Sequence, residues 1–182
     1  PGGLPPMNGE STRPGLFARA RSAARDAFVA GLDQAERNEW PNDFRNTAHD
    51  GQLPPECDWR IWLMMAGRGF GKTRAGAEWV RLIADTNQNA KIALIAASLG
   101  EARSVMVEGE SGIMSVFPPE STPVYEASLR RISFRNGAEA TLYSAAEPES
   151  LRGPQHSHAW CDELAKWNNS HRRAERTWDN LQ

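Results

Sequence analysis

Apolar residues gather in three short runs, and the segments between these runs have the spacing of helices. The runs are residues 61–65 (IWLMM), 91–97 (KIALIAA) and 159–161 (AWC), and short continuous runs of this kind are typical of buried parallel strands. Residues 74–84 have an amphipathic helical pattern, and Ser98 can cap a second helix that extends to about Val107. Alternating strands and helices predict an α/β fold with a mainly parallel sheet flanked by helices.

A hairpin is predicted in the second half of the chain. Residues 129–134 alternate between apolar and polar, residues 138–143 alternate again, and Asn136-Gly137 lies between them. Asn-Gly between two alternating runs favours a type I′ turn, in which both central residues have positive φ. After the last apolar run, residues 170–182 have the pattern of a helix, for which Trp167 and Trp178 are possible anchors.

The first 50 residues have a different composition. Residues 1–14 are rich in Pro, Gly and Ser and are predicted to form a loose arm. Residues 16–32 have roughly helical spacing, and this helix either packs on the core or forms a partner-binding arm. Residues 36–55 are polar and contain three prolines, as a linker does. We therefore predict an arm and linker over residues 1–50 and a folded α/β domain over residues 51–182.

Length and composition are those of an ordinary soluble domain. The chain has 182 residues, 40% hydrophobic and 24% charged, with a net charge of −2. This charge gives no overall signature of a nucleic-acid binder, although a local basic patch can exist within a balanced total. No run is long enough to cross a bilayer, and no secretory signal is visible. Cys57 and Cys161 are the only cysteines, which predicts a reduced, cytosolic protein without disulfides.

The sequence AGRGFGKT, residues 66–73, lies between the first predicted strand and the first predicted helix. Strand, glycine-rich turn, Lys-Thr and helix follow one another in a phosphate-binding loop, whose backbone N–H groups point at an anion. Lys72 would contact the β- and γ-phosphates of a nucleotide, and the Thr73 hydroxyl would ligate Mg²⁺. The usual leading glycine is Ala66, which fits if it keeps negative φ. The residues predicted to bind nucleotide here are Ala66, Gly67, Arg68, Gly69, Phe70, Gly71, Lys72 and Thr73.

Asp162 and Glu163 end the last apolar run, as the acids of a Walker B motif do. Asp162 would hold Mg²⁺, and Glu163 would polarise the attacking water as the catalytic base. Adjacent acids at a strand end point in different directions, so that one can face the metal and the other the γ-phosphate. The alternative is a pair of acids that caps the following helix.

Two arginines could neutralise the charge that builds up on a γ-phosphate. Arg68 lies inside the phosphate loop, and Arg152 lies in a glycine-containing loop before the acids. Arg152 could act within its own chain or in a neighbour's site. For both residues the alternative is a surface arginine paired with an acid.

Other residues allow weaker interpretations. Trp59 or Arg60 could stack on the adenine, although tryptophans at such positions are more simply core aromatics. His156, His158 and Cys161 resemble part of a metal site, but three ligands on one short stretch without a fourth do not predict zinc.

Five stretches of the chain resemble the ATPase domain of the large terminase subunit, the DNA-packaging motor of tailed phages and of phage-derived gene transfer agents. They are residues 59–62 (WRIW), 66–81 (AGRGFGKTRAGAEWVR), 101–109, 151–154 (LRGP) and 162–164 (DEL). The resemblance covers roughly residues 50–182. An arginine inside the phosphate loop together with Arg-Gly before the Asp-Glu pair is more specific than a phosphate loop alone.

The resemblance implies an ASCE-type P-loop NTPase that hydrolyses ATP with Mg²⁺ to translocate double-stranded DNA into a preformed capsid. It implies a homo-oligomeric ring, commonly of five subunits, docked on the portal protein in the bacterial cytoplasm and assisted by a small terminase subunit. By the same resemblance, Lys72 and Thr73 contact nucleotide and Mg²⁺, Asp162 is the Walker B acid and Glu163 the base. Arg152 matches a position that in some relatives acts as an arginine finger on the neighbouring subunit.

By this resemblance, further parts of a large terminase subunit are expected after residue 182. The last strands of the ATPase sheet, the coupling motif and an RNase H-like nuclease domain would follow there, so we expect an N-terminal fragment without nuclease activity. One alternative is a module that binds ATP and Mg²⁺ but is not active alone. Another is a helicase-like nucleic-acid-dependent ATPase, which the absence of helicase motifs between residues 97 and 152 disfavours. A small-molecule kinase would need an acceptor-binding lid, which the sequence does not show.

Overall fold

The computed structural model describes residues 28–34, 43–168 and 170–182. The chain divides into two units, Pro1–Ala66 and Gly67–Gln182, which are described separately. The predicted arm of residues 1–14 and most of the predicted helix of residues 16–32 lie outside the described residues. Of that helix the structure describes the end, where residues 28–31 are helical.

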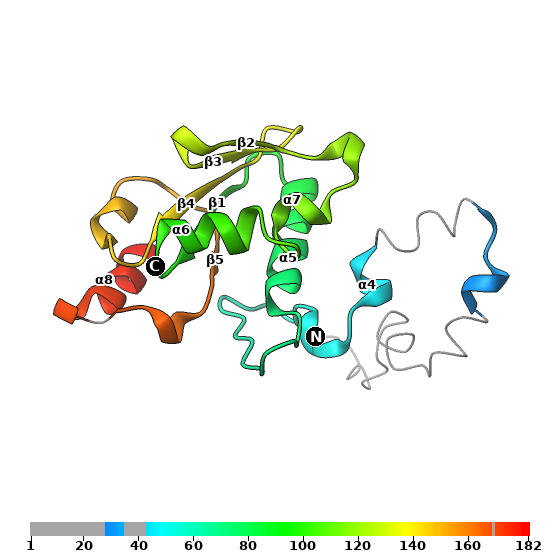
Figure 1. The fold of residues 1–182 in the computed structure, drawn as a ribbon, viewed down its shortest axis with the longest axis horizontal. Helices are drawn as coiled ribbons and strands as arrows, with labels where there is room; N and C mark the ends of the chain where they lie inside the picture. Colours follow the sequence, from blue (N-terminus) through cyan, green and yellow to red (C-terminus); the bar gives the residue numbers. More distant parts are fainter. Residues whose placement is uncertain (1–27, 35–42, 169) are drawn as a thin grey trace, which may run out of the picture. The chain divides into compact units, whose positions relative to one another are not determined.

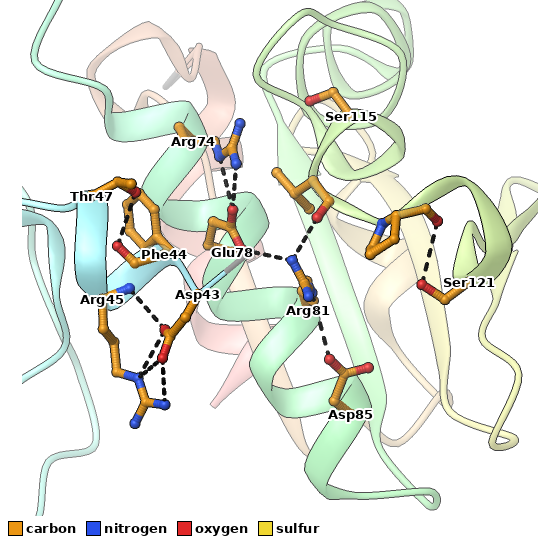
Figure 2. A network of polar contacts seen from close by, with 12 residues as sticks. Asp43, Phe44, Arg45, Thr47, Arg74, Glu78, Arg81, Asp85, Ser115 and Ser121 are labelled. Carbon is orange, nitrogen blue, oxygen red and sulfur yellow. Dashed lines mark hydrogen bonds and ion pairs between the residues drawn. The ribbon is translucent and has the colours of Figure 1, made fainter. Parts of the chain in front are cut away.

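The first unit contains short helical turns where the sequence predicted a linker. Helix α4 (Phe44–Thr47) begins at Asp43, whose side chain accepts a hydrogen bond from the Arg45 backbone N–H at 3.0 Å. The Asp43 carboxylate also pairs with the Arg45 guanidinium, as Figure 2 shows. A 3₁₀ turn, η2 (Asp50–Gln52), follows. In α4 the short polar side chain of Asp43 satisfies a backbone donor at the start of the helix, whereas in η2 the Gln52 side chain accepts a hydrogen bond from His49 N–H at 3.2 Å.

The strand predicted over residues 61–65 is wrong. The segment is not part of any described strand, and Ile61, Leu63 and Met65 are 55%, 60% and 85% exposed. An apolar run favours an extended backbone, but a strand also needs a neighbour for its N–H and C=O groups.

The second unit is built around a five-stranded sheet in the order β2-β3-β4-β1-β5 (Figure 1). Its strands are β1 (Lys91–Ala96), β2 (Val124–Glu126), β3 (Arg131–Ser133), β4 (Glu139–Ser144) and β5 (His158–Cys161). Strand β1 pairs in parallel with β4 and with β5, whereas β3 pairs antiparallel with β2 and β4. The sheet is therefore mixed rather than mainly parallel. The cause is the tight turn between β3 and β4, because a short connection can join only antiparallel neighbours.

The predicted hairpin is confirmed, but its turn is not type I′. Phe134 N–H donates to Ala138 C=O at 2.9 Å, which leaves residues 135–137 as the loop. Gly137 has φ 103°, whereas Asn136 is not among the described residues with positive φ. The Asn136 side chain instead donates to the Ala84 carbonyl at 2.6 Å and accepts from Ala138 N–H at 3.2 Å. This contact with the preceding helix selects a three-residue loop that ends in a left-handed glycine.

Helices on one face of the sheet form the larger core. They are α5 (Lys72–Thr86), η3 (Ala102–Val107) and α7 (Ile113–Val116). Their apolar residues pack against strand residues such as Ile92, Leu94 and Ile132. The short helix α6 (Leu99–Glu101) begins where the Ser98 hydroxyl accepts a hydrogen bond from Glu101 N–H at 3.2 Å. It continues into η3, so the predicted helix ending near Val107 is confirmed, although η3 is a π-helix.

The other face is covered by the C-terminal helix α8 (Arg173–Leu181) and the turn η6 (Pro148–Leu151). Figure 1 shows α8 at the red end of the colour range, away from α5. The predicted C-terminal helix is confirmed. Trp167 is buried in this smaller core, whereas Trp178 is only half-buried. The anchor that the sequence did not reveal is Thr177, which is fully buried and donates to Ala145 C=O at 2.9 Å.

Helix α5 is fixed by two close contacts. An added Cβ at Gly76 would lie 2.3 Å from Cε2 of Trp160, so the glycine lets the β5 indole lie directly on the helix. The buried Glu78 carboxylate accepts a hydrogen bond from Arg74 at 2.6 Å and lies 3.7 Å from Arg81. Arg81 in turn donates to the Val116 carbonyl of α7 at 2.7 Å (Figure 2). The first contact holds α5 against β5, and the second joins α5 to α7.

Both cysteines are free thiols, as predicted. In the described part of the chain, no helix is long and apolar enough to cross a membrane.

Candidate functional site

A cavity of about 470 Å³ lies where helix α5 begins and strand β5 ends. Three segments that are far apart in the sequence line it: the phosphate loop, the end of η3 with the loop after it, and the acids after β5. In open α/β sheets, ligands bind at this carboxyl edge of the strands. The lining residues are Arg68, Gly69, Phe70, Gly71, Lys72, Thr73, Arg74, Ser104, Val105, Gly109, Glu110, Ser111, Asp162 and Glu163.

The phosphate loop has the backbone that its glycines predict. Gly69 and Gly71 have φ of 79° and 86°, a left-handed conformation that residues with a Cβ rarely adopt. Gly71 is the N-cap of α5, so the first N–H groups and the positive dipole end of that helix belong to the wall of the cavity. The Lys72 ammonium donates to the Gly67 carbonyl at 2.9 Å. In this structure the Lys72 side chain therefore contacts the loop itself, at the loop that would bind a phosphate.

Asp162 is positioned by its backbone on both sides. Its N–H donates to the Ile95 carbonyl at 2.8 Å, which extends the β1–β5 pairing by one residue. Its carbonyl accepts a hydrogen bond from the Trp167 indole at 3.0 Å. Within the described residues, its half-buried carboxylate has no hydrogen bond or ion pair. Burial, followed by the negative charge of Glu163, raises the pKa of this carboxyl group. A cation bound at this carboxylate would offset the free energy that burial of the ionised group costs.

Glu163 follows with a left-handed backbone, φ 44° and ψ 55°. Its carboxylate is exposed and forms an ion pair with the Lys166 ammonium. This hydrogen bond is the main cause that lowers the pKa of Glu163, and the charges of Lys72 and Arg68 act in the same direction. Glu163 makes no side-chain cap to the following turn, η7 (Leu164–Lys166). The helix-capping alternative therefore has no support for this residue.

The two adjacent acids thus have opposite environments. Asp162 is half-buried, and its pKa is raised, whereas Glu163 is exposed among cations, and its pKa is lowered. Pairs of carboxyl groups separated in this way take different chemical roles. The Asp162 side chain and the Thr73 hydroxyl, which also has no hydrogen bond within the described residues, are oxygen donors of the kind Mg²⁺ prefers. The carboxylate of Glu163 is ionised at neutral pH, as a base must be.

The sequence did not reveal the part of the cavity wall that η3 and the loop after it form. Ser104 and Val105 come from η3, and Gly109, Glu110 and Ser111 from the loop after it. Gly109 allows this loop to turn back, because a Cβ there would lie 2.7 Å from the Val105 carbonyl. Within the described residues, the side chains of Ser104, Glu110 and Ser111 form no hydrogen bond or ion pair. The available signal was a polar Gly-Glu-Ser after a predicted helix, which is too common to indicate a site by itself.

The two candidate arginines lie in different places. Arg68 lines the cavity. Arg152 does not line it; its guanidinium pairs with Glu149 at 2.9 Å and donates to the Asn180 side chain of α8 at 3.3 Å. Arg176 of α8 pairs with the same Glu149. The Arg152 side chain is nevertheless 63% exposed.

The remaining candidates lie outside this cavity. Trp59, Arg60 and Ala66 belong to the first unit, where the Trp59 and Trp62 rings pack edge to face at 6.1 Å, so an adenine contact stays a prediction. His156 packs against Tyr143 and His158 against Trp79. No group of three His, Cys, Asp or Glu side chains among the described residues could hold a metal ion.

The geometry agrees with a comparison against protein families. Comparison with curated protein sequences finds no match. A family model described as the N-terminal part of the T4likevirus-type terminase large subunit matches residues 63–175, a range that contains every residue of the cavity. The chain belongs to this family of large terminase subunits, whose role is in viral DNA packaging.

Proposed function

We propose that this chain binds ATP and Mg²⁺ in the cavity and hydrolyses the β–γ bond of ATP. The observation that carries the proposal is that one cavity joins the phosphate loop, residues 68–73, to Asp162 and Glu163. A P-loop ATPase needs a phosphate cradle, a metal-binding acid and a base for water, and this cavity holds candidates for all three.

The residues present fit a nucleotide with its metal. The N–H groups at the start of α5 and the Lys72 ammonium would bind the β- and γ-phosphates. Thr73 and Asp162 would hold Mg²⁺, and the half-buried Asp162 carboxylate without a hydrogen bond or ion pair within the described residues is the feature that favours a cation. When bound, Mg²⁺ supplies charge neutralisation on the phosphate oxygens.

Glu163 is the proposed base. Its carboxylate takes a proton from water while the water oxygen bonds to the γ-phosphorus and the bond from that phosphorus to the bridging oxygen breaks, giving ADP and phosphate. Arg68, which lines the same cavity, would stabilise the charge that develops on the transferred group.

We also propose a setting for this activity. Copies of the chain would form a ring, commonly of five, on the portal protein of a procapsid in the bacterial cytoplasm, where a small terminase subunit assists. Hydrolysis would drive double-stranded DNA into the capsid. The exposed position of Arg152, away from the cavity of its own chain, supports a role for this arginine in a neighbour's site.

Steady-state ATP hydrolysis over a wide range of protein concentration tests the proposal. We expect the specific activity to rise with concentration, because neighbouring subunits complete one another's sites, and to vanish in Glu163→Gln. Lys72→Ala should lose binding of a fluorescent ATP analogue, whereas Lys91→Ala, a matched removal of a lysine at the exposed start of β1, should bind as the parent does. Turnover that survives Glu163→Gln would show that the site is not the one described.

A second function, ATP binding without turnover by the isolated chain, is favoured by one observation. The arginines among the described residues of the cavity are Arg68 and Arg74, and Arg74 is already bound to the buried Glu78. If hydrolysis requires a further arginine that copies of this chain do not supply to one another, the chain would bind ATP and show no turnover at any concentration.

A further inference from the structure

The Glu163 carboxylate is held by a neighbour three residues along the chain. Lys166 N–H donates to the Glu163 carbonyl at 2.8 Å, which closes the turn η7, and the Lys166 ammonium pairs with Glu163 Oε2. The turn is compact because Glu163 takes the left-handed conformation, with φ 44°. In this structure, backbone and side-chain contacts between these two residues therefore direct the carboxylate toward the lysine.

The two partners differ in their relation to the cavity. Glu163 lines the cavity, whereas Lys166 does not, although both belong to the same turn. Lys166 thus occupies one oxygen of a carboxylate that lines the cavity, and this oxygen is then not available to a water beside a γ-phosphate. A base must lie within hydrogen-bond reach of the proton that it takes. The contact seen here therefore competes with the position needed for the reaction.

Lys166 also has another acid to which it can turn. After Glu163, the next charge that raises the pKa of Lys166 is that of Glu101, at the end of α6. Asp162 contributes more weakly in the same direction. The ammonium can therefore leave Glu163 without losing all its negative neighbours. Both members of the Lys166–Glu163 pair are about half-exposed, at 57% and 44%, so the pair is easily broken.

We propose that Lys166 is a positioning residue that holds the Glu163 carboxylate away from the attacking water and so limits the rate of ATP hydrolysis. The inference rests on the proposed function, because it concerns the base of that reaction. Release of Lys166 is then a step that precedes each turnover, and anything that draws the ammonium to other acids accelerates the enzyme.

Lys166→Met, which removes the charge and keeps most of the side-chain length, tests this role in the full chain. We expect kcat to rise about two- to fivefold, the range that corresponds to loss of an exposed ion pair, while KM for ATP stays unchanged. Lys166→Arg should retain the low rate of the parent, and Lys91→Met is the matched control at an exposed lysine outside the site. A merely structural lysine would not separate kcat from KM in this way.

Displacement of a fluorescent ADP analogue gives a readout besides turnover. In Lys166→Met, ADP with Mg²⁺ and aluminium fluoride, which imitates the transferred phosphoryl group, should bind tighter by the same factor as the rise in kcat. ADP alone should bind as it does to the parent. An unfolding midpoint equal to that of the parent would show that the variant is folded.

The outcomes separate the two proposals. If the parent hydrolyses ATP and Lys166→Met has an unchanged or lower kcat, the positioning role is refuted, and the proposed function stands. An equal rise in Lys91→Met would also refute it, because the effect would then be one of overall charge. If neither the parent nor Glu163→Gln shows any turnover or any binding of the aluminium fluoride complex, the proposed function fails, and this inference fails with it.

Discussion

The close contact between Gly76 and Trp160 predicts that any side chain at position 76 weakens the packing of α5 on the sheet. In Gly76→Ala, the new Cβ would lie 2.3 Å from Cε2, 2.5 Å from Cζ2 and 2.7 Å from Nε1 of the indole. Trp160 is 9% exposed and belongs to the larger core, so the ring cannot swing into solvent. Either the indole or the helix must shift.

Helix propensity and overpacking act in opposite directions on the free energy of unfolding of Gly76→Ala. Alanine is favoured over glycine in a helix interior by about 1 kcal/mol, whereas overpacking a core typically costs about 1–3 kcal/mol. Because the overlap is with a rigid, buried ring, we expect overpacking at the upper end and a net loss of about 1–2 kcal/mol in the free energy of unfolding. For a chain of this size that lowers the unfolding midpoint by about 2–8 °C.

Urea unfolding of four variants measures this effect. Gly100→Ala is the matched control, since the nearest atom to its added Cβ is Ser98 Oγ at 3.8 Å, and it should be as stable as the parent or more so. In a Trp160→Leu background, the loss caused by Gly76→Ala should largely disappear, which a double-mutant cycle would report as a coupling energy. A Gly76→Ala variant as stable as Gly100→Ala would contradict this overlap with the indole, and so would an equal loss of stability with leucine at position 160.

Three further predictions concern charge. Asp162→Asn should raise the stability of the ligand-free chain at neutral pH, because burial disfavours the ionised carboxylate. It should also abolish the rise in melting temperature on adding Mg²⁺ with ADP. A variant less stable than the parent would contradict the first expectation. Burial lowers the pKa of His156, assisted by Lys91, and burial also lowers the pKa of His158. The unfolded chain therefore takes up protons first, and urea unfolding should show stability falling as pH drops below about 6.5, with a shallower fall in His156→Gln. Arg152→Ala should keep the affinity for a fluorescent ATP analogue and lose about 10³-fold or more in turnover, and parental turnover would exclude it as the arginine finger.

The sequence predicted the elements whose structure depends on neighbouring residues in the chain. The glycine-rich turn before α5 could be predicted from residues 66–73, because its glycines act through local backbone geometry, and residues 68–73 do line the cavity. Strands β1 and β5 and helix α5 followed from continuous apolar runs and helical spacing. Asp162 and Glu163 could be predicted as site residues because they end an apolar run. The sequence could not show that they share a cavity with the loop.

The errors arose where a distant segment decides the local structure. Residues 61–65 have the composition of a strand, but no described strand pairs with them. The turn at Asn136 was predicted from its neighbours, whereas its amide bonds to Ala84 of α5, which no short-range rule includes. Thr177 anchors α8 through a single hydrogen bond to Ala145, a contact with no periodic signature. Likewise, the wall formed by η3 and the loop after it becomes visible only when the sheet brings it opposite the phosphate loop.

Adjacent residues at the end of β5 have conformations or environments that local physics disfavours. Asp162 keeps a half-buried carboxylate that has no hydrogen bond or ion pair within the described residues, and Glu163 has a left-handed backbone that costs a residue with a Cβ about 1 kcal/mol or more. Neither feature stabilises the chain, and both lie on one wall of the same cavity. Features that cost stability and lie together in one cavity are typical of a functional site, which agrees with the proposed roles of Asp162 as a metal ligand and Glu163 as a base. If a cation binds at Asp162, as proposed, the free energy that burial of the ionised carboxylate costs the ligand-free chain is recovered, and metal binding is coupled to folding at this strand end.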